Sequence, residues 1–428
     1  MKNPNVFFNT KYLVKCFILC VFFTCVLCSS CWNYREIDDI YIVAAAAIDI
    51  NPENNNYILT VEVYDFEKSR ASSGKTTEIF SAEGMTLFES LRNVIKYSGR
   101  RLYWGHAKVM IISSELAKQG IARACDWIIR DAEVRLDTYI TISKEESARK
   151  ILRAFEQTPS QQAAKEKQNG VGSSSNSNKS SSQGEEEVIS MQIFDALKSH
   201  SSLGKTCSVK IHELIELLAC ECVEACLPTV SIQNIYGKPY TDVSGMALFK
   251  GEKLVGFLSP EESFYALFVK SKIKGGIFNS EIPMPQKPRT SLPLQNDFAL
   301  EIFNEKASIK YDIKEDDKIS FDIHVEVHTA IAEEARKIDY FDPKSLEKIV
   351  FASEQILNER IHSVILKVQK HFNTDIFGLA RHIKNSNPSF WKKISRHWYD
   401  IFPETAVRVD SKIKIRNAGV TSKGIEVK

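Results

Sequence analysis

Ile40-Tyr-Ile-Val-Ala-Ala-Ala-Ala-Ile-Asp-Ile50 is the stretch of the chain that decides the fold. It is almost continuously apolar and contains neither glycine nor proline, a pattern that predicts a buried strand. The turn-rich residues 51–56 follow it, and residues 57–66 then alternate apolar and polar side chains, as a half-exposed partner strand does. We therefore expect these two segments to pair and the first domain to be built on them.

Strand and helix patterns alternate along the chain after this pair. The expected elements, in order, are a strand at 78–82, a helix marked by Leu87, Leu91, Val94 and Ile95 that stops near Gly99, a strand after it, a helix at 114–129, a strand at 138–142 and a helix at 144–155. Strands that alternate with helices indicate a mixed α/β sheet covered by helices.

Residues 157–187 interrupt this pattern. They consist largely of Ser, Asn, Gln, Gly, Lys and Glu, with almost no apolar side chains. A segment of this composition cannot bury a core, so we expect it to be a disordered polar insertion. Helical patterns resume at 189–197 and 211–227, which makes the insertion a long loop inside an N-terminal α/β domain at residues 31–235.

Two smaller domains are expected after residue 235. A small α+β middle domain at 236–295 would contain a hairpin at 242–257 and a helix at 260–269, and it ends in a proline-rich segment. The C-terminal domain, residues 296–428, would hold an antiparallel sheet packed by a long helix. Its expected elements are strands at 298–305, 307–313 and 319–329, an amphipathic helix that begins at Asp342-Pro343, helical segments at 376–383 and 390–398, and a strand at 406–415. The fold class is thus α+β (mixed α/β), in an elongated protein of three domains.

Residues 1–30 have the pattern of a lipoprotein signal peptide. Lysines precede an uncharged apolar run at 16–28, which is shorter than the roughly 18 residues expected of a membrane-spanning helix. Ser29 and Ser30 are the small residues that bacterial lipoprotein processing needs before the modified cysteine. We expect Cys31 to become the mature N-terminus and to carry acyl groups such as palmitate, two of which anchor stably. Plain secretion and a retained transmembrane anchor are the alternatives.

Composition argues against one broad class of function. The 428 residues are 26% charged and 43% hydrophobic, as in an ordinary globular protein, and the formal net charge is only +2. Lysine and arginine form no clustered block of the kind that nucleic-acid binding requires. We therefore expect no nucleic acid among the partners.

The cysteines do not form an obvious framework. Ten are present, of which five follow Cys31, an odd number that is too sparse for a disulfide scaffold. Cys220, Cys222 and Cys226 lie in the expected helix at 211–227, where Cys222 and Cys226 would share a face. A thiolate metal site with His212 is one interpretation, but the spacing matches no standard zinc pattern. Buried free thiols that act as small apolar side chains are the favoured interpretation.

Motifs that carry catalysis or bind cofactors are not convincing anywhere in the sequence. Gly74-Lys75-Thr76 and Gly204-Lys205-Thr206 lack the upstream glycines of a phosphate-binding loop. Ser-x-x-Lys occurs in several scattered copies and has no discriminating power, while Gly-x-Ser-x-Gly and His-Glu-x-x-His are absent. We expect a protein that is not an enzyme and that holds no cofactor or metal.

Several blocks of sequence follow one another along the mature chain in an order that is more specific than any single motif. They include Cys31-Trp32-x-x-Arg35-Glu36-Ile37, Gly99-Arg100-Arg101-Leu102-Tyr103-Trp104-Gly105-His106, Arg130-Asp131-x-Glu133-Val134-Arg135, Ser244-Gly245-Met246-Ala247-x-Phe249-Lys250-Gly251 and Trp398-x-x-Ile401-Phe402-Pro403. Together they resemble the Ger(x)C family of spore germination lipoproteins. Ala45 and Ala47 depart from the family by replacing glycines that are usual in the first strand.

This resemblance implies a non-enzymatic C subunit of a nutrient germinant receptor with a three-domain α/β fold. The implied partners are two integral membrane subunits, A and B, and the implied location is the outer face of the spore inner membrane, with Cys31 as the lipid anchor. The family defines no catalytic residues. A solute-binding lipoprotein of a transport system is the alternative function, and a cell-wall hydrolase is a weaker one.

One block of arginine, aromatic and histidine residues is our candidate for contact with the partner subunits. Its residues are Arg100, Arg101, Tyr103, Trp104 and His106. Aromatic and arginine side chains are common where proteins bind one another. Strand or core packing is the alternative for Tyr103 and Trp104, and a satisfied, half-buried structural role is the alternative for His106.

Overall fold

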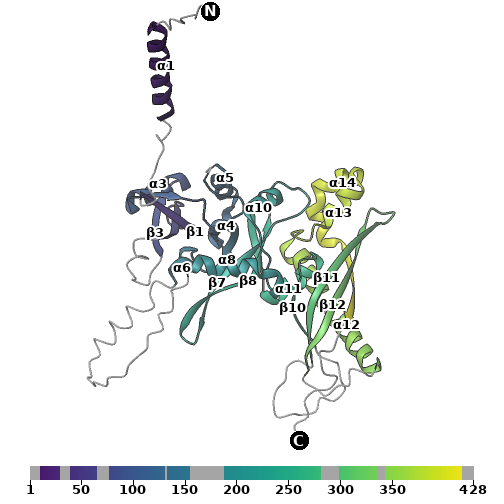
Figure 1. Cartoon of the computed structure of the whole chain (residues 1–428). Helices are drawn as coiled ribbons and strands as arrows, with labels where there is room; N and C mark the ends of the chain where they lie inside the picture. Colours follow the sequence, from purple (N-terminus) through teal and green to yellow (C-terminus); the bar gives the residue numbers. More distant parts are fainter. Residues whose placement is uncertain are drawn as a thin grey trace, which may run out of the picture.

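The computed structural model describes residues 10–28, 39–64, 77–130, 133–154, 188–280, 298–334 and 343–416. Cys31, the expected insertion at 157–187 and the proline-rich segment lie outside these described residues. The folded body contains two sheets with helices around them, and helix α1 (Thr10–Cys28) projects away from it (Figure 1). Within the described part of the chain, no helix has both the length and the apolar character needed to cross a membrane.

The larger sheet is organised around its strand β1 (Ile40–Ile50). The other strands are β2 (Tyr57–Tyr64), β3 (Thr77–Gly84), β4 (Arg101–Tyr103), β5 (Val109–Ser113), β6 (Tyr139–Ser143), β7 (Cys226–Ile235), β8 (Lys238–Lys250) and β9 (Lys253–Leu258). Among the described residues their order is β3-β2-β1-β5-β6-β7-β8-β9, with β4 paired to β1. β1 runs antiparallel to β2 and parallel to β5, so the prediction of a mixed sheet is confirmed.

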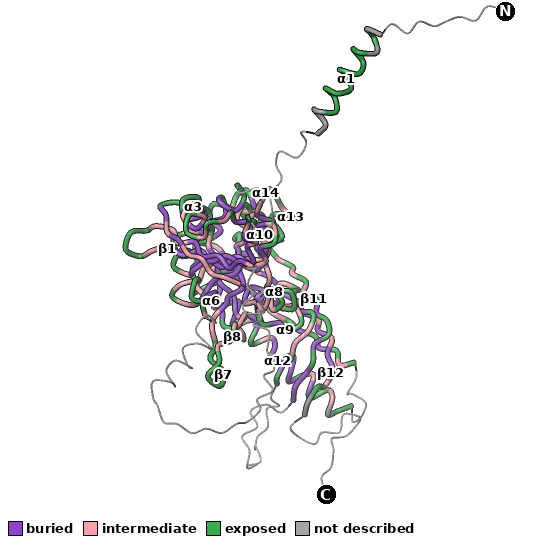
Figure 2. The backbone as a smooth tube through the Cα atoms, turned by 60° about the vertical axis from the view of Figure 1, so that its left-hand side comes forward, coloured by how far each residue is buried: buried purple, intermediate pink, exposed green. Residues whose placement is uncertain are grey.

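Helices cover both faces of this sheet (Figure 1). One face carries α3 (Leu87–Ser98), α4 (Ser114–Gln119), α5 (Ala122–Arg130) and α10 (Ile211–Leu218), and the other carries α6 (Arg149–Arg153) and α8 (Ile189–Lys198), which the short α9 (His200–Leu203) follows. β1 is buried on both faces, as the purple centre of Figure 2 shows. Ala45 and Ala47 face α6 and α8, and their small side chains let these helices approach closely.

Two buried carboxylates on β1 and β2 hold the helices of that second face. Asp49 accepts hydrogen bonds from the N–H groups of Ala148 (2.6 Å) and Arg149 (3.0 Å) at the start of α6. Glu62 accepts one from the N–H of Ser190 (3.2 Å) in the first turn of α8. Burial raises the pKa of both carboxyl groups, and these hydrogen bonds offset part of the rise. Burial is therefore the cause of the raised pKa values, and the role of both carboxylates is to cap the two helices.

The hairpin that the sequence placed in the middle domain continues the larger sheet. β7 and β8 form an antiparallel hairpin whose last pair is Ile235 and Lys238, and β9 pairs with β8. The boundary expected at residue 235 thus falls at the tip of a hairpin, and the division into domains stays a prediction. α11 (Pro260–Val269) follows β9 and begins with a capping box, in which Ser259 and Glu262 each accept the other's N–H through their side chains.

Two helices expected in the N-terminal domain differ in extent from their sequence patterns. The helix expected at 114–129 is two helices, α4 and α5, because Gly120 between them has a φ of +135° and leaves the helical conformation. The helix expected at 144–155 is reduced to α6, which starts where Asp49 caps it.

The smaller sheet has the strand order β10-β11-β12-β13. Its strands are β10 (Gly276–Ser280), β11 (Phe298–Ile313), β12 (Ile319–Glu334) and β13 (Ala406–Ile415). β11 and β12 are antiparallel as expected, and β10, from the expected middle domain, pairs antiparallel with β11. β13 runs parallel to β12, so the sheet is mixed and not purely antiparallel. Parallel neighbours need a long crossover connection, and the helices between β12 and β13 supply it.

This crossover begins with the long helix predicted from the sequence. The helix α12 (Pro343–Lys367) buries Ile349, Ile361 and Ile365 completely. The helical segments after it are η3 (Val368–Phe372), α13 (Leu379–Ser386), α14 (Pro388–Ile394), η4 (Ser395–His397), α15 (Trp398–Ile401) and η5 (Phe402–Glu404).

A β-bulge explains why the sequence of β11 has the pattern of two strands. The pairing register with β12 steps from Ile302 to Asn304, so Phe303 is an extra residue in the strand. This residue reverses the alternation, with the result that Ile302 and then Glu305 are buried. The two strands expected on either side of residue 306 are therefore one continuous strand.

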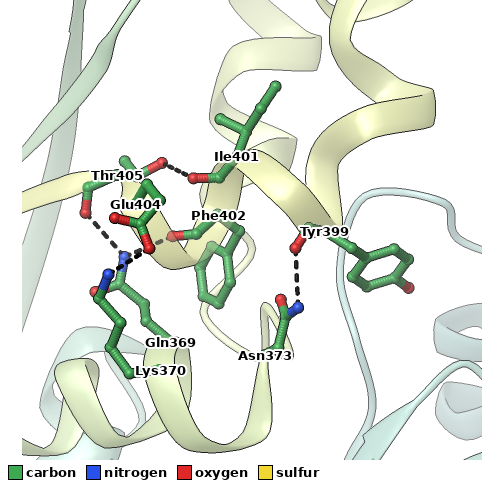
Figure 3. A network of polar contacts seen from close by, with 8 residues as sticks. All are labelled: Gln369, Lys370, Asn373, Tyr399, Ile401, Phe402, Glu404 and Thr405. Carbon is green, nitrogen blue, oxygen red and sulfur yellow. Dashed lines mark hydrogen bonds and ion pairs between the residues drawn. The ribbon is translucent and has the colours of Figure 1, made fainter.

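A polar network fastens η3 and the residue after it to the segment before β13 (Figure 3). The buried Gln369 donates from Nε2 to the backbone carbonyls of Phe402 (2.9 Å) and Thr405 (3.1 Å). Asn373 donates from Nδ2 to the carbonyl of Tyr399 (2.9 Å). These bonds satisfy backbone groups at the end of the crossover and set the approach of β13 to the sheet.

Glu305 makes the stability of the protein depend on pH. Its Oε1 accepts a hydrogen bond from the N–H of Ile273 (3.2 Å). Burial raises the pKa of this carboxyl group from 4.5 to about 7, and the hydrogen bond offsets only part of the rise. The folded protein keeps a proton that the unfolded chain releases, so the free energy of unfolding falls as the pH rises from 4.5 to about 7. At about 1.4 kcal/mol per pH unit, the loss is about 3 kcal/mol.

We expect Glu305→Gln, which removes the charge and keeps the shape, to stabilise the protein by up to about 3 kcal/mol near pH 8 and to have little effect near pH 4.5. Denaturant unfolding of the full chain in detergent, followed by circular dichroism across this range, measures the difference. Glu301→Gln, at an exposed position of the same strand, is the control. Parallel pH profiles for Glu305→Gln and the original protein would contradict the prediction.

Candidate partner-contact surface

The residues expected to contact a partner lie beside the start of β1. Gly99 ends α3 in the left-handed conformation (φ +74°) and donates its N–H to the carbonyl of Ile95. This turn leads into β4, whose Arg101 lies opposite Ile40 in a parallel pairing with β1. The candidate residues therefore adjoin the point where the chain that comes from Cys31 enters the folded body.

Trp104 belongs to the core and not to this surface. Its side chain is only 1% exposed and packs edge-to-face against Trp127, with ring centroids 5.4 Å apart. Its backbone carbonyl accepts the N–H of Ala107 (3.0 Å), so the buried ring anchors the loop between β4 and β5. The expectation that Trp104 contacts a partner is wrong in this structure, and the alternative of core packing describes the residue.

The other candidates reach the surface at least in part. Arg101 forms an ion pair with Glu133, and the guanidinium of Arg100 lies 4.9 Å from the centre of a tyrosine ring of β1. Tyr103 is 39% exposed, and its ring lies 5.9 Å from that of the exposed His106. Their role in binding a partner stays a prediction.

A cavity of about 250 Å³ adjoins these residues at the amino-terminal ends of β5 and β6. We call it the basic cavity. It is lined by Gly105, Ala107, Lys108, Arg135, Asp137, Thr138, Tyr139, Phe194, Lys198 and Lys210. Four of these side chains are basic and one is acidic, which gives the lining a net charge of +3.

Charges and aromatic rings are interleaved in the basic cavity. Arg135 holds Asp137 through two nitrogen–oxygen contacts of 2.9 Å, and this hydrogen bonding lowers the pKa of Asp137 against the opposing effect of partial burial. The ammonium of Lys108 lies 5.5 Å from the ring centre of Phe194, and other aromatic carbon lines the same wall. Since Arg135 already neutralises Asp137, the lysines give the cavity an excess of positive charge that suits an anionic group.

The described residues do not contain a metal centre. No group of three or more histidine, cysteine, aspartate and glutamate side chains in them could hold a metal ion. His212 bonds through Nδ1 to the carbonyl of Leu136 (3.0 Å) and not to the nearby cysteines. The helix expected to carry those cysteines ends at Leu218, and Cys226 begins β7, so Cys222 and Cys226 do not share a helical face. A short apolar run does not distinguish a buried helix from a buried strand, which is why this prediction failed.

Sequence reasoning missed most of the basic cavity. Phe194 and Lys198 are four residues apart on α8, a spacing that places them on the same side of the helix. That signal was present in the sequence. Lys210 reaches the cavity because it forms an isolated β-bridge with Tyr139. No local pattern announces such a bridge between distant segments.

Two family models match the chain in order. The first, described as "Spore germination protein N-terminal domain", matches residues 33–180, and the second, described as "Spore germination B3/ GerAC like, C-terminal", matches residues 244–419. These matches, on a fold of two mixed sheets with helices, define the class as spore germination proteins.

Relatives align with nearly the whole chain. The chain is 24% identical to spore germination protein B3 of Bacillus subtilis (strain 168) over 407 residues, which cover 94% of this chain and 98% of the relative. It is 23% identical to spore germination protein KC of the same organism, covering 92% and 94% of the two chains. It is 22% identical to spore germination protein GerQC of Bacillus cereus, covering 91% and 95%. The chain belongs to the Ger(x)C family of spore germination proteins.

A solved structure is also similar. The crystal structure of the GerBC protein aligns with a TM-score of 0.48 and 21% sequence identity, covering 87% of this chain and 97% of that one.

The different burial of two neighbouring aromatic residues predicts different costs of truncation. We expect Trp104→Ala to lower the free energy of unfolding by about 3–5 kcal/mol, because it empties a core position. Tyr103→Ala, the matched surface variant, should change it by less than about 1 kcal/mol. Denaturant unfolding of the full chain in detergent, followed by circular dichroism, measures both values. Equal costs would show that the assignment of Trp104 to the core is incorrect.

Proposed function

We propose that this protein is a lipid-anchored, non-enzymatic subunit of a nutrient germinant receptor, which assembles with integral membrane subunits A and B on the outer face of the spore inner membrane. The observation that supports this most directly is the match of two spore germination family models, in order, along most of the chain. Relatives named as spore germination proteins align over more than nine tenths of their own length, which extends the likeness to the whole protein.

The N-terminal helix supports the proposal of a removable leader. α1 projects away from the folded body in both views (Figures 1 and 2). Its large apolar side chains are exposed, with Phe17 at 70% and Phe22 at 66%. An apolar surface left without packing is typical of a segment that meets a membrane or another protein. Removal of this helix would leave Cys31 as the acylated N-terminus.

An anchor at Cys31 would keep the candidate surface close to the membrane. Eight residue steps lead from Cys31 to Asp39, the first described residue of the body, and they reach at most about 29 Å. β4 pairs with the first residues of β1, and Lys108 at the edge of the basic cavity donates its N–H to Ala44 of the same strand (2.8 Å). Confinement of this kind raises the effective concentration of the surface near membrane subunits, so modest contacts suffice for assembly.

The charge of the basic cavity indicates the chemistry of the contact. We propose that it receives acidic side chains of one membrane subunit, with Arg101, Tyr103 and His106 beside it. Opposite charges across an interface select the partner and its orientation.

Cys31→Ala tests the anchor. We expect the variant to leave the spore membrane fraction and nutrient-triggered germination to fall severely, because the chain loses its confinement to the membrane. Fractionation with an immunoblot and a germination assay on the same spores measure both effects. Cys28→Ala, which alters a cysteine inside the proposed leader, is the control and should leave both readouts unchanged.

Two outcomes would contradict this part of the proposal. One is retention of Cys31→Ala in the membrane together with normal germination. The other is tight stoichiometric binding of a nutrient by the purified full chain alone, since this would favour a solute-binding lipoprotein.

Charge reversal tests the basic cavity. We expect Lys108→Glu combined with Lys198→Glu to reduce co-purification with the membrane subunits and nutrient-triggered germination at least several-fold, because the lining changes from net positive to net negative. The variant should keep its membrane location and its circular dichroism spectrum. Lys253→Glu, at an exposed position of β9, is the control. Normal co-purification of the double variant would rule out the cavity as the contact.

A further inference from the structure

Cys220 and Cys222 face one another in the turn that follows α10. Their Sγ atoms are 2.9 Å apart, closer than the roughly 3.5–4.0 Å of ordinary non-bonded contacts. Cys220 is half-buried and Cys222 is 5% exposed, so the pair lies at the surface with one thiol more accessible than the other. Glu221 alone separates them in the sequence.

A positive charge from the C-terminal helices lies beside this pair. The guanidinium of Arg381, on α13, donates toward Sγ of Cys220 at 3.9 Å. Burial raises the pKa of the Cys220 thiol, but the hydrogen bonds from Cys222 and Arg381 outweigh burial and the net shift is downward. Burial and the neighbouring Cys220 raise the pKa of Cys222. The Cys220 thiol therefore loses its proton more readily than an ordinary cysteine, and Cys222 lies in contact with it as a resolving thiol.

The other described cysteines of the folded body lack this combination. Cys125 is buried, and burial raises the pKa of its thiol to about 12. Cys207 and Cys226 lie near one another, where the Cys207 thiol donates to the Cys226 carbonyl at 3.6 Å, but both are buried. Closeness, access and a neighbouring cation coincide at Cys220 and Cys222.

We propose that Cys220 and Cys222 form a redox-active dithiol, which a low-molecular-weight disulfide oxidises to an intramolecular disulfide. The Cys220 thiolate attacks one sulfur of the oxidant R–S–S–R, forming a mixed disulfide and releasing R–S⁻. Cys222 loses its proton to solvent and attacks Sγ of Cys220, which releases the second R–S⁻. The protein gives up two electrons and two protons, and the oxidant becomes two R–SH.

Oxidation at this position alters a contact between the two parts of the body. The turn that holds the pair also carries Glu224, whose N–H donates to the carbonyl of Asp375 (3.0 Å) and whose carboxylate accepts the hydroxyl of Tyr399. Disulfide formation removes the thiolate that faces Arg381 and restrains the turn. The redox state of the pair is therefore coupled to the packing of the C-terminal helices on the larger sheet.

The residue between the two cysteines makes the disulfide directly detectable. The full chain in detergent is equilibrated with mixtures of reduced and oxidised glutathione, quenched in acid, alkylated and cleaved after glutamate. Cleavage after Glu221 separates Cys220 from Cys222, so only a disulfide keeps their fragments together. We expect mass spectrometry to find the joined fragments at oxidising ratios and to lose them reversibly at reducing ratios.

Matched variants test each element of the site. Cys220→Ser and Cys222→Ser should each abolish the joined fragments, whereas Cys125→Ser should leave them unchanged. Arg381→Gln should slow alkylation of Cys220 several-fold at neutral pH, because the thiolate loses its positive neighbour. Arg396→Gln, at an exposed position of the same region, is the control for that measurement.

Two results would overturn the proposal. One is the absence of joined fragments at every glutathione ratio while both thiols react freely with the alkylating reagent. The other is a disulfide that joins either cysteine to Cys226. The assay measures thiol chemistry on the isolated chain, so its outcome does not depend on assembly with membrane subunits.

Discussion

Burial of β1 on both faces is the constraint on which the rest of the structure depends. A strand in this position needs small or apolar side chains on each side, and the alanines of β1 leave room for α6 and α8. The exception is Asp49, a buried carboxylate, which the fold accommodates because the first N–H groups of α6 surround it. Glu62 on the neighbouring strand does the same for α8. Apolar contacts thus hold α6 and α8 against the sheet, and the carboxylates of Asp49 and Glu62 hold the first turns of these helices in place.

The sequence predicts those parts of the fold that interactions between neighbouring residues determine. The buried strand, the hairpin expected at 242–257, the long helix and the last strand follow from local composition and periodicity, and the structure contains them. The sequence did not predict features that depend on contacts between distant segments. The bulge at Phe303 depends on the pairing partner, and the parallel direction of β13 depends on where the crossover delivers the chain. Burial of Trp104 depends on its contact with Trp127, which lies on α5.

At the candidate surface, too, the sequence predicts only what depends on neighbouring residues. Short-range signals located the block around Arg101, Tyr103 and His106, because arginine and aromatic residues cluster there in the sequence. The basic cavity beside it is assembled from β5, β6, α8 and the residue before α10, so it exists only in the folded chain. In the larger sheet, burial raises the pKa values of Asp49 and Glu62, and both carboxylates cap helices, which gives them a structural role. The lining of the cavity combines an excess of positive charge with aromatic rings.

Tyr399 joins the two sheets at a single residue. Its carbonyl accepts the amide of Asn373 within the crossover, its hydroxyl donates to Glu224, and its ring lies 4.2 Å from the ammonium of Lys250 at the end of β8. A hinge motion of one sheet against the other would have to break the contacts of Tyr399 with Glu224 and Lys250. Tyr399 therefore couples the position of the crossover between β12 and β13 to the end of β8 and to the turn before β7.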